Sequence, residues 1–268
     1  MKRTQCTAPA KLALVLTLTL LFAGAANAQW NAPNAYGYST GYGTVYGSFG
    51  LASTMQSMYN VARAKSQTAG TAKTSGTSAR TKNPSSSNTH VVVPPPRVVR
   101  NHGLFRPDAS VDTGKAMADA LGDTPEHKAL IREIYSATKT GYDEAAASRG
   151  WKNNIAGGLT FFTIAAMTVY HAAEEPGEAA VDTHFKTLNA ALDEVPDFAA
   201  ISDTEKQRFN NVLIGFAGIL LATYTEGKQS KDAETLAGSK KLAGMLIEMV
   251  LKTKPENLRL ENSQIAMK

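Results

Sequence analysis

The chain is 268 residues long, 43% of them hydrophobic, and its formal net charge is +5. Its only cysteine, Cys6, lies in an N-terminal segment that we expect to be cleaved off. A cysteine-free mature chain excludes disulfide bonds, thiol catalysis and thiolate metal sites, so its folded part must be stabilised by its core alone.

Residues 1–28 are typical of a secretory signal peptide. Three basic residues precede an apolar run over residues 12–22, and Ala-Asn-Ala at 26–28 provides the small residues that a signal peptidase requires. We therefore expect cleavage before Gln29 and export to the periplasm or out of the cell.

Basic and acidic residues are unevenly divided along the rest of the chain. Loss of the signal would leave 25 Lys and Arg residues against 23 Asp and Glu residues. Residues 29–107 hold eight of these bases and no acid, whereas residues 108–268 hold 17 bases and 23 acids. A basic tail on a mildly acidic domain favours contact with anionic envelope polymers or a lipid surface, and indicates no specific nucleic acid partner.

The tail has three segments of different composition. Residues 29–50 form a Gly/Tyr-rich low-complexity segment, for which a solvated spacer is favoured over stacking by the tyrosines. Residues 51–65 place apolar side chains at helical spacing and predict a short amphipathic helix, which docks either on the main domain or on a partner. Residues 66–103 form a Ser/Thr/Pro-rich basic linker that we expect to be disordered, because most of it has nothing apolar to bury.

Residues 104–268 predict an all-α fold, a compact antiparallel bundle of five to six helices. Apolar periodicity and helix stop signals place the helices at about residues 113–121, 124–150, 154–173, 178–194, 202–227 and 231–251. The connections are a few residues long, which favours antiparallel neighbours. No alternating strand pattern of useful length follows Leu104.

The bundle is expected to be organised around residues 154–173. From Ile155 onward, nineteen consecutive residues carry no formal charge, a length close to that of a membrane span. Threonines, glycines, Tyr170 and His171 make this stretch too polar for a typical span. We expect a buried helix that packs against residues 212–225, with Gly157, Gly158, Gly215 and Gly218 allowing the two to cross closely. A membrane-inserting hairpin of the two segments is the alternative.

Four residues near the end of this helix are weak candidates for a metal site or a helical hydrolase. His171 and Glu175 are four residues apart, and Asp182 and His184 lie just across the following turn, which would allow the four to converge. A histidine at this position more often caps carbonyls or pairs with a carboxylate. No HExxH, phosphate-loop or nucleophile-elbow motif occurs. The sequence therefore predicts no catalytic residue, no metal and no cofactor.

The most distinctive polar cluster is the sequence GYD at 141–143 followed by RGWKNN at 149–154. Its side chains are candidates for a binding surface: Tyr142, Asp143, Trp151, Asn153 and Asn154. Helix termination by Gly150 and capping by an asparagine is the favoured alternative.

These motifs, with the signal, the Gly/Tyr-rich run and the sequence GLTFF, resemble secreted bacterial proteins grouped as a domain of unknown function, family 6683. The resemblance implies an exported helical domain and brings no activity, ligand or site. The sequence as a whole favours an exported, non-enzymatic helical domain for binding or structure, with a flexible basic tail that contacts the cell envelope.

Overall fold

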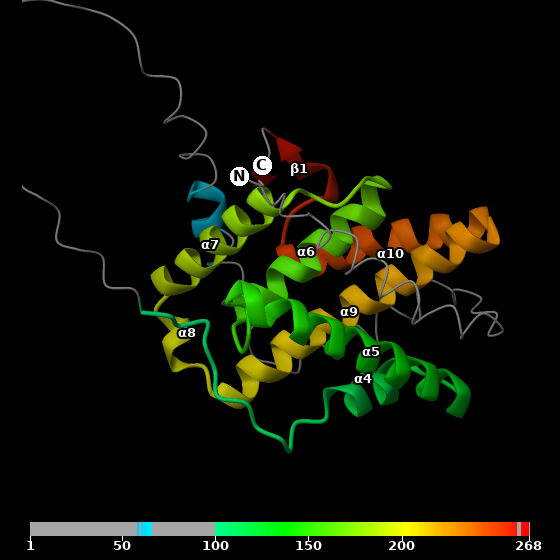
Figure 1. The fold of residues 1–268 in the computed structure, drawn as a ribbon, viewed down its shortest axis with the longest axis horizontal. Helices are drawn as coiled ribbons and strands as arrows, with labels where there is room; N and C mark the ends of the chain where they lie inside the picture. Colours follow the sequence, from blue (N-terminus) through cyan, green and yellow to red (C-terminus); the bar gives the residue numbers. More distant parts are fainter. Residues whose placement is uncertain (1–57, 59, 66–99, 262–263, 268) are drawn as a thin grey trace, which may run out of the picture.

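A computed structural model describes residues 58, 60–65, 100–261 and 264–267 (Figure 1). The predicted signal peptide, the Gly/Tyr-rich segment and residues 66–99 of the predicted linker lie outside the described residues. Residues 51–57 of the predicted short helix also lie outside them.

From residue 100 onward most of the described chain is helical and very little of it is strand, which confirms the all-α class. The helices are α4 (Thr113–Leu121), α5 (Pro125–Arg149), α6 (Ile155–His171), α7 (Glu178–Glu194), α8 (Asp197–Ala200), α9 (Asp203–Ser230) and α10 (Ala233–Leu251). A single 3-10 turn, η1 (Pro255–Asn257), then leads into the strands β1 (Leu258–Glu261) and β2 (Gln264–Met267). The two strands pair antiparallel, with Leu258 opposite Met267.

Two elements were not predicted from the sequence. The single-turn helix α8 begins directly after Pro196, two residues beyond the end of α7, and it fully buries Phe198. The hairpin of β1 and β2 corrects the expectation of no strands after Leu104. Each strand has only four residues, too few for an alternating pattern to stand out from the sequence.

The helix ends follow the local sequence as predicted. Thr124 caps the start of α5, and Gly150 ends α5 in the left-handed conformation at φ +69°. Ser202 and Glu205 form both hydrogen bonds of a capping box at the start of α9. Helix α9 continues to Ser230, three residues beyond the predicted end.

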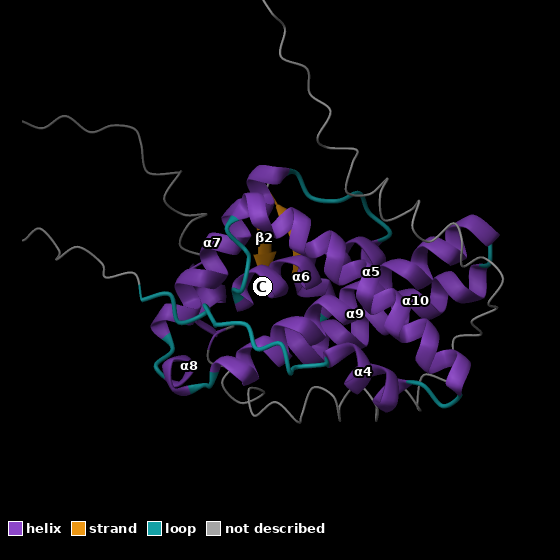
Figure 2. Ribbon diagram, turned by 60° about the horizontal axis from the view of Figure 1, so that its bottom comes forward, coloured by secondary structure: helices purple, strands orange, loops and turns teal. Residues whose placement is uncertain are grey.

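Helix α6 lies inside the bundle, where it packs against α7, α9 and α10 (Figures 1 and 2). Thirteen of its 17 residues are buried, which confirms the predicted central helix. The buried hydroxyls of Thr160 and Thr163 each donate to the carbonyl four residues earlier at 2.7 Å, so neither is left without a partner. Among the described helices, none combines the length and apolarity needed to cross a lipid bilayer.

The surroundings of the glycines confirm that helices pack closely, but two of the glycines face other helices than predicted. A methyl group at Gly158 of α6 would overlap the side chain of Asn210 on α9, so these two helices do approach closely there. Gly215 and Gly218 of α9 instead face α4 and α5, through Met117 and Thr138. The prediction that they face α6 is wrong, because α9 packs against helices on more than one side.

The described part of the predicted short helix, residues 58 and 60–65, packs on the bundle. Within it, Met58 and Ala62 are fully buried in the main core. Lys65 reaches the last residue of α7, where its Nζ lies 2.5 Å from the carboxylate of Glu194. Figure 1 shows this segment in cyan beside α7.

The chain before α4 runs over the surface of the bundle (Figure 2). The carboxylate of Asp193 accepts the backbone amides of Arg100, at 3.3 Å, and His102, at 2.8 Å. Further along, Leu104 bridges to Asn154, and the backbone of Asp108 exchanges two hydrogen bonds with a glutamine side chain of α9. The described contacts with the bundle therefore include Arg100, four residues before the expected domain start.

The tight contact between α9 and α5 is testable by Gly218→Ala. The added methyl carbon would lie 2.9 Å from Cβ of the buried, branched side chain of Thr138. We expect overpacking to lower the free energy of unfolding by about 1–3 kcal/mol, measured by urea denaturation.

Two further variants complete this test. Thr138→Ala in the same chain removes two of the three clashing atoms and should recover part of the loss. Gly177→Ser, at a position with open space around the glycine, should leave stability within about 0.5 kcal/mol. Equal stability of Gly218→Ala and the unchanged protein would contradict this packing.

Candidate functional site

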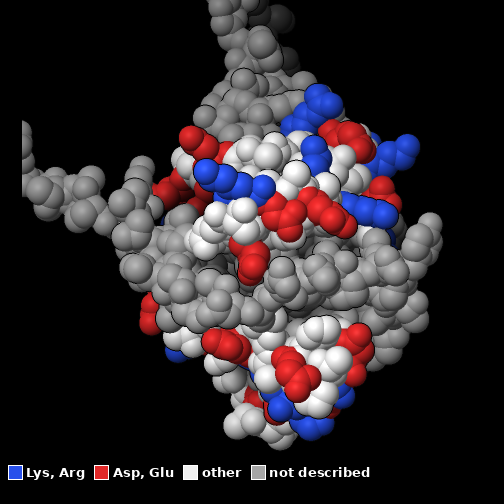
Figure 3. Space-filling model, turned by 90° about the vertical axis from the view of Figure 1, so that its right-hand side faces the viewer, with Lys and Arg blue, Asp and Glu red and all other residues white. Residues whose placement is uncertain are grey.

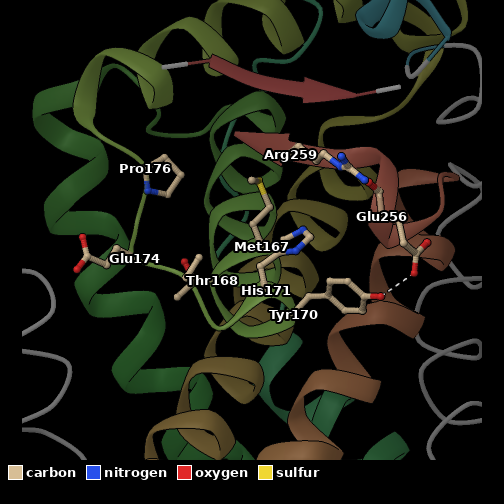
Figure 4. A pocket seen from close by; sticks show the side chains of 9 residues that line it. Met167, Thr168, Tyr170, His171, Glu174, Pro176, Glu256 and Arg259 are labelled. Carbon is tan, nitrogen blue, oxygen red and sulfur yellow. Dashed lines mark hydrogen bonds between the residues drawn. The ribbon is translucent and has the colours of Figure 1, made fainter. Parts of the chain in front are cut away.

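A pocket of about 430 Å³ opens where α6 ends (Figure 4). Small-molecule sites in proteins span about 300–1,000 Å³, so this cavity is large enough for a ligand. The last turn of α6, the loop to α7 and the C-terminal segment form its walls. The surface that faces the cavity is largely apolar, although more than half of the lining residues are polar. The lining residues are Met167, Tyr170, Ala173 and Pro176, with the polar residues Thr168, His171, Glu174, Glu256 and Arg259.

Two adjacent side chains at the end of α6 hold the C-terminal wall in place. The hydroxyl of Tyr170 donates to the carboxylate of Glu256 at 2.7 Å, and Nε2 of His171 lies 2.8 Å from the carbonyl oxygen of Leu258. Because a carbonyl can only accept, we assign the ring proton of His171 to Nε2, which leaves Nδ1 for another partner. The wall that carries η1 and β1 is thus fastened to α6 from two points.

The charges around Tyr170 keep this pair in a single protonation state near neutral pH. The hydrogen bond from Tyr170 lowers the pKa of Glu256, and the same bond raises the pKa of the Tyr170 hydroxyl. The ammonium of Lys240 lies 5.4 Å from the centre of the Tyr170 ring, a cation–π contact on the same side chain. The pair is therefore suited to fastening the wall rather than to transferring protons.

Arg259 and Glu174 stand on opposite sides of the pocket (Figure 4). The Nε–H of Arg259 donates to the backbone carbonyl of Glu256 at 2.8 Å, which fixes the direction of the guanidinium. The side chain of Glu174 points away from the other labelled side chains. Arg259 therefore provides a positive charge with a fixed direction at this site.

The structure does not bring the four candidate metal ligands together. His171 binds the carbonyl of Leu258, whereas Asp182 lies 3.7 Å from Arg149, the last residue of α5. Glu175 is exposed over much of its surface, although partial desolvation raises its pKa. His184 is buried in α7. Within the described part of the chain, no three His, Cys, Asp or Glu residues form a group that would hold a metal ion.

The polar cluster near the start of α6 serves mainly packing and capping. Tyr142 and Trp151 are 2% and 3% exposed, and the Tyr142 hydroxyl donates to the backbone carbonyl of Trp151 at 3.2 Å. Asp143 pairs with Lys139 one turn earlier on α5. Asn153 takes the left-handed conformation at φ 55°, and Asn154 caps α6 by accepting the amide of Ala156 at 2.9 Å.

A family model described as "Family of unknown function (DUF6683)" matches residues 7–268 of the chain. The match spans both the tail and the helical domain. The chain belongs to this family. No curated protein and no solved structure matches it.

In this DUF6683 member, the pocket combines one residue singled out from the sequence, His171, with several that were not. Glu256 and Arg259 lie more than 80 residues further along the chain, and no local motif links them to α6. One feature of the sequence did point to this site: the pair Tyr170 and His171 at the polar end of a buried helix. Such a pair needs hydrogen-bond partners from elsewhere in the fold.

His184 gives a prediction for the pH dependence of stability. It is 3% exposed, its Nε2 has no hydrogen-bond partner in the described part of the chain, and burial lowers its pKa to about 4 from the ordinary 6.5. Between these two values the unfolded chain binds the proton and the folded chain does not. Stability should therefore fall as the pH drops from 6.5 to 4, by about 3 kcal/mol in total.

The measurement is urea denaturation of the DUF6683 chain and of its His184→Leu variant across this pH range. The variant has no proton to bind at this position, so the difference in unfolding free energy should change by that amount between pH 6.5 and 4. Parallel curves for the two proteins would contradict a buried neutral His184.

Proposed function

We propose that this DUF6683 member is an exported, non-enzymatic α-helical binding protein whose ligand site is the pocket at the end of α6. The pocket itself carries the proposal. Two segments far apart in sequence form it, residues 167–176 and residues 256–259, and the side chains of Tyr170 and His171 hold its C-terminal wall. A largely apolar cavity with a few oriented polar groups is the usual form of a small-molecule site.

The state of the polar groups supports binding over hydrolysis. A serine- or threonine-type hydrolase needs a hydroxyl within hydrogen-bond reach of a general base. The hydroxyl of Thr168, the candidate nucleophile in this pocket, has no hydrogen-bond partner among the residues that the structure describes, so His171 is not placed to activate it. His171 instead donates to the backbone of Leu258. The polar atoms are thus placed to shape the cavity.

The pocket proposal predicts that Ala173→Phe blocks binding of an apolar dye. Ala173 lines the pocket from the loop before α7, where a phenyl group would occupy ligand space. With Nile red as the probe, we expect a saturable fluorescence increase for the unchanged protein. Binding to the variant should be at least about tenfold weaker, because the loss of apolar contact surface costs about 1.4 kcal/mol or more.

The matched control for this experiment is Ala179→Phe. Ala179 is an exposed alanine on α7 that does not line the pocket, so the same added ring should leave dye binding unchanged. Equal dye binding by Ala173→Phe and the unchanged protein would rule out this cavity as the site.

The basic tail is proposed to hold the protein at an anionic envelope surface. Residues 66–99 hold four basic residues and no acid. The chain on either side of this segment is attached at the end of α7, through Lys65 to Glu194 and through the amide of Arg100 to Asp193. Figure 3 shows Lys and Arg intermingled with Asp and Glu on one face of the described domain, which makes the tail the better source of a basic contact.

The tail proposal predicts salt-sensitive binding to vesicles that contain phosphatidylglycerol, and little binding to pure phosphatidylcholine. Replacing the four basic residues of this segment by glutamine should weaken binding by about 1 kcal/mol for each charge lost. Both the salt dependence and the affinity can be read from vesicle sedimentation. The residues to replace are Lys73, Arg80, Lys82 and Arg97.

A control variant removes the same number of charges from exposed positions on the domain and should bind as the unchanged protein does. Suitable positions are Arg132, Lys152, Lys186 and Lys228. If the two variants bind equally, the tail is not the contact.

A further inference from the structure

The guanidinium of Arg259 has hydrogen-bond donors that the described contacts within the fold do not occupy. The backbone carbonyl of Glu256 takes its Nε–H, which orients the guanidinium but leaves the Nη groups available. Among the side chains that the structure describes, no carboxylate forms an ion pair with Arg259. An oriented, unpaired guanidinium beside an apolar cavity is suited to a ligand that carries an acid.

The rest of the lining sets limits on that ligand. Met167, Ala173 and Pro176 offer apolar surface, which favours a hydrocarbon body over a sugar or a nucleotide. Two carboxylates, those of Glu174 and Glu256, also line the pocket, and the carbonyl end of α6 adds partial negative charge. A ligand with two negative charges would be repelled more strongly than one with a single charge.

We propose that the pocket binds a small monocarboxylate with an apolar body, and that the guanidinium of Arg259 holds its carboxylate. This inference rests on the proposed binding function of the same pocket and adds the chemical class of the ligand. Glu256 forms no ion pair with this guanidinium in the described structure. Its carboxylate accepts from Tyr170, and its backbone carbonyl accepts the Nε–H of Arg259. The apolar body lies against the residues from α6 and the following loop.

The test compares three probes that share a six-carbon chain: hexanoate, hexanol and hexyl phosphate. Titration calorimetry with the purified protein should show hexanoate binding more tightly than either of the others. Arg259→Gln should weaken hexanoate binding at least about tenfold, because a hydrogen bond to a charged group is lost, and should leave hexanol binding unchanged. Arg132→Gln removes an equal charge from an exposed position on α5 and should leave all three affinities unchanged.

Each other outcome overturns a separate part of the proposal. Equal affinity for hexanoate and hexanol, or no effect of Arg259→Gln, overturns the carboxylate site while the pocket remains a binding site. Tighter binding of hexyl phosphate overturns the preference for a single charge. If none of the three probes binds and Nile red binding is unaffected by Ala173→Phe, both this inference and the proposed pocket function fail.

Discussion

The burial of α6 against α9 is the contact on which the rest of the fold depends. Helix α6 has no acidic or basic side chain before His171, so its stability comes from neighbours that cover it on several sides. Gly158 lets α9 approach so closely that a single methyl group would overlap Asn210. Contact at this range gains dispersion energy along the whole crossing but tolerates little change in volume. The two ends of α6 are consequently fixed points for the chain segments that attach to them.

Those two ends have different roles. At the start of α6, Asn154 caps the helix and also bridges to Leu104, so the chain before α4 is aligned by the same residue. At the other end, Tyr170 and His171 extend beyond the buried part and bind the segment that follows α10. The pocket forms at this second end, between the loop to α7 and the segment of η1 and β1. The proposed function therefore depends on how the central helix ends.

The sequence predicted the helices better than it predicted the site, for physical reasons. Thr124, Gly150 and Ser202 act on amides within four residues, so their effect is visible locally. The pocket instead depends on where Arg259 falls relative to α6, which follows from the packing of α10 and the hairpin. His171 was noticed for its side chain, yet its partner is the backbone carbonyl of Leu258, and a carbonyl has no signature in sequence. The candidate metal ligands do not meet for a related reason. Asp182 lies beside Arg149 of α5, and His184 is buried in α7.

Lys65 and Arg100 contact neighbouring residues of α7, Glu194 and Asp193. Met58 and Ala62, which precede Lys65, are buried in the core. A single proteolytic cut between residues 65 and 100 would therefore leave both fragments bound to the same domain. The cut would become visible only after denaturation, when the two fragments separate.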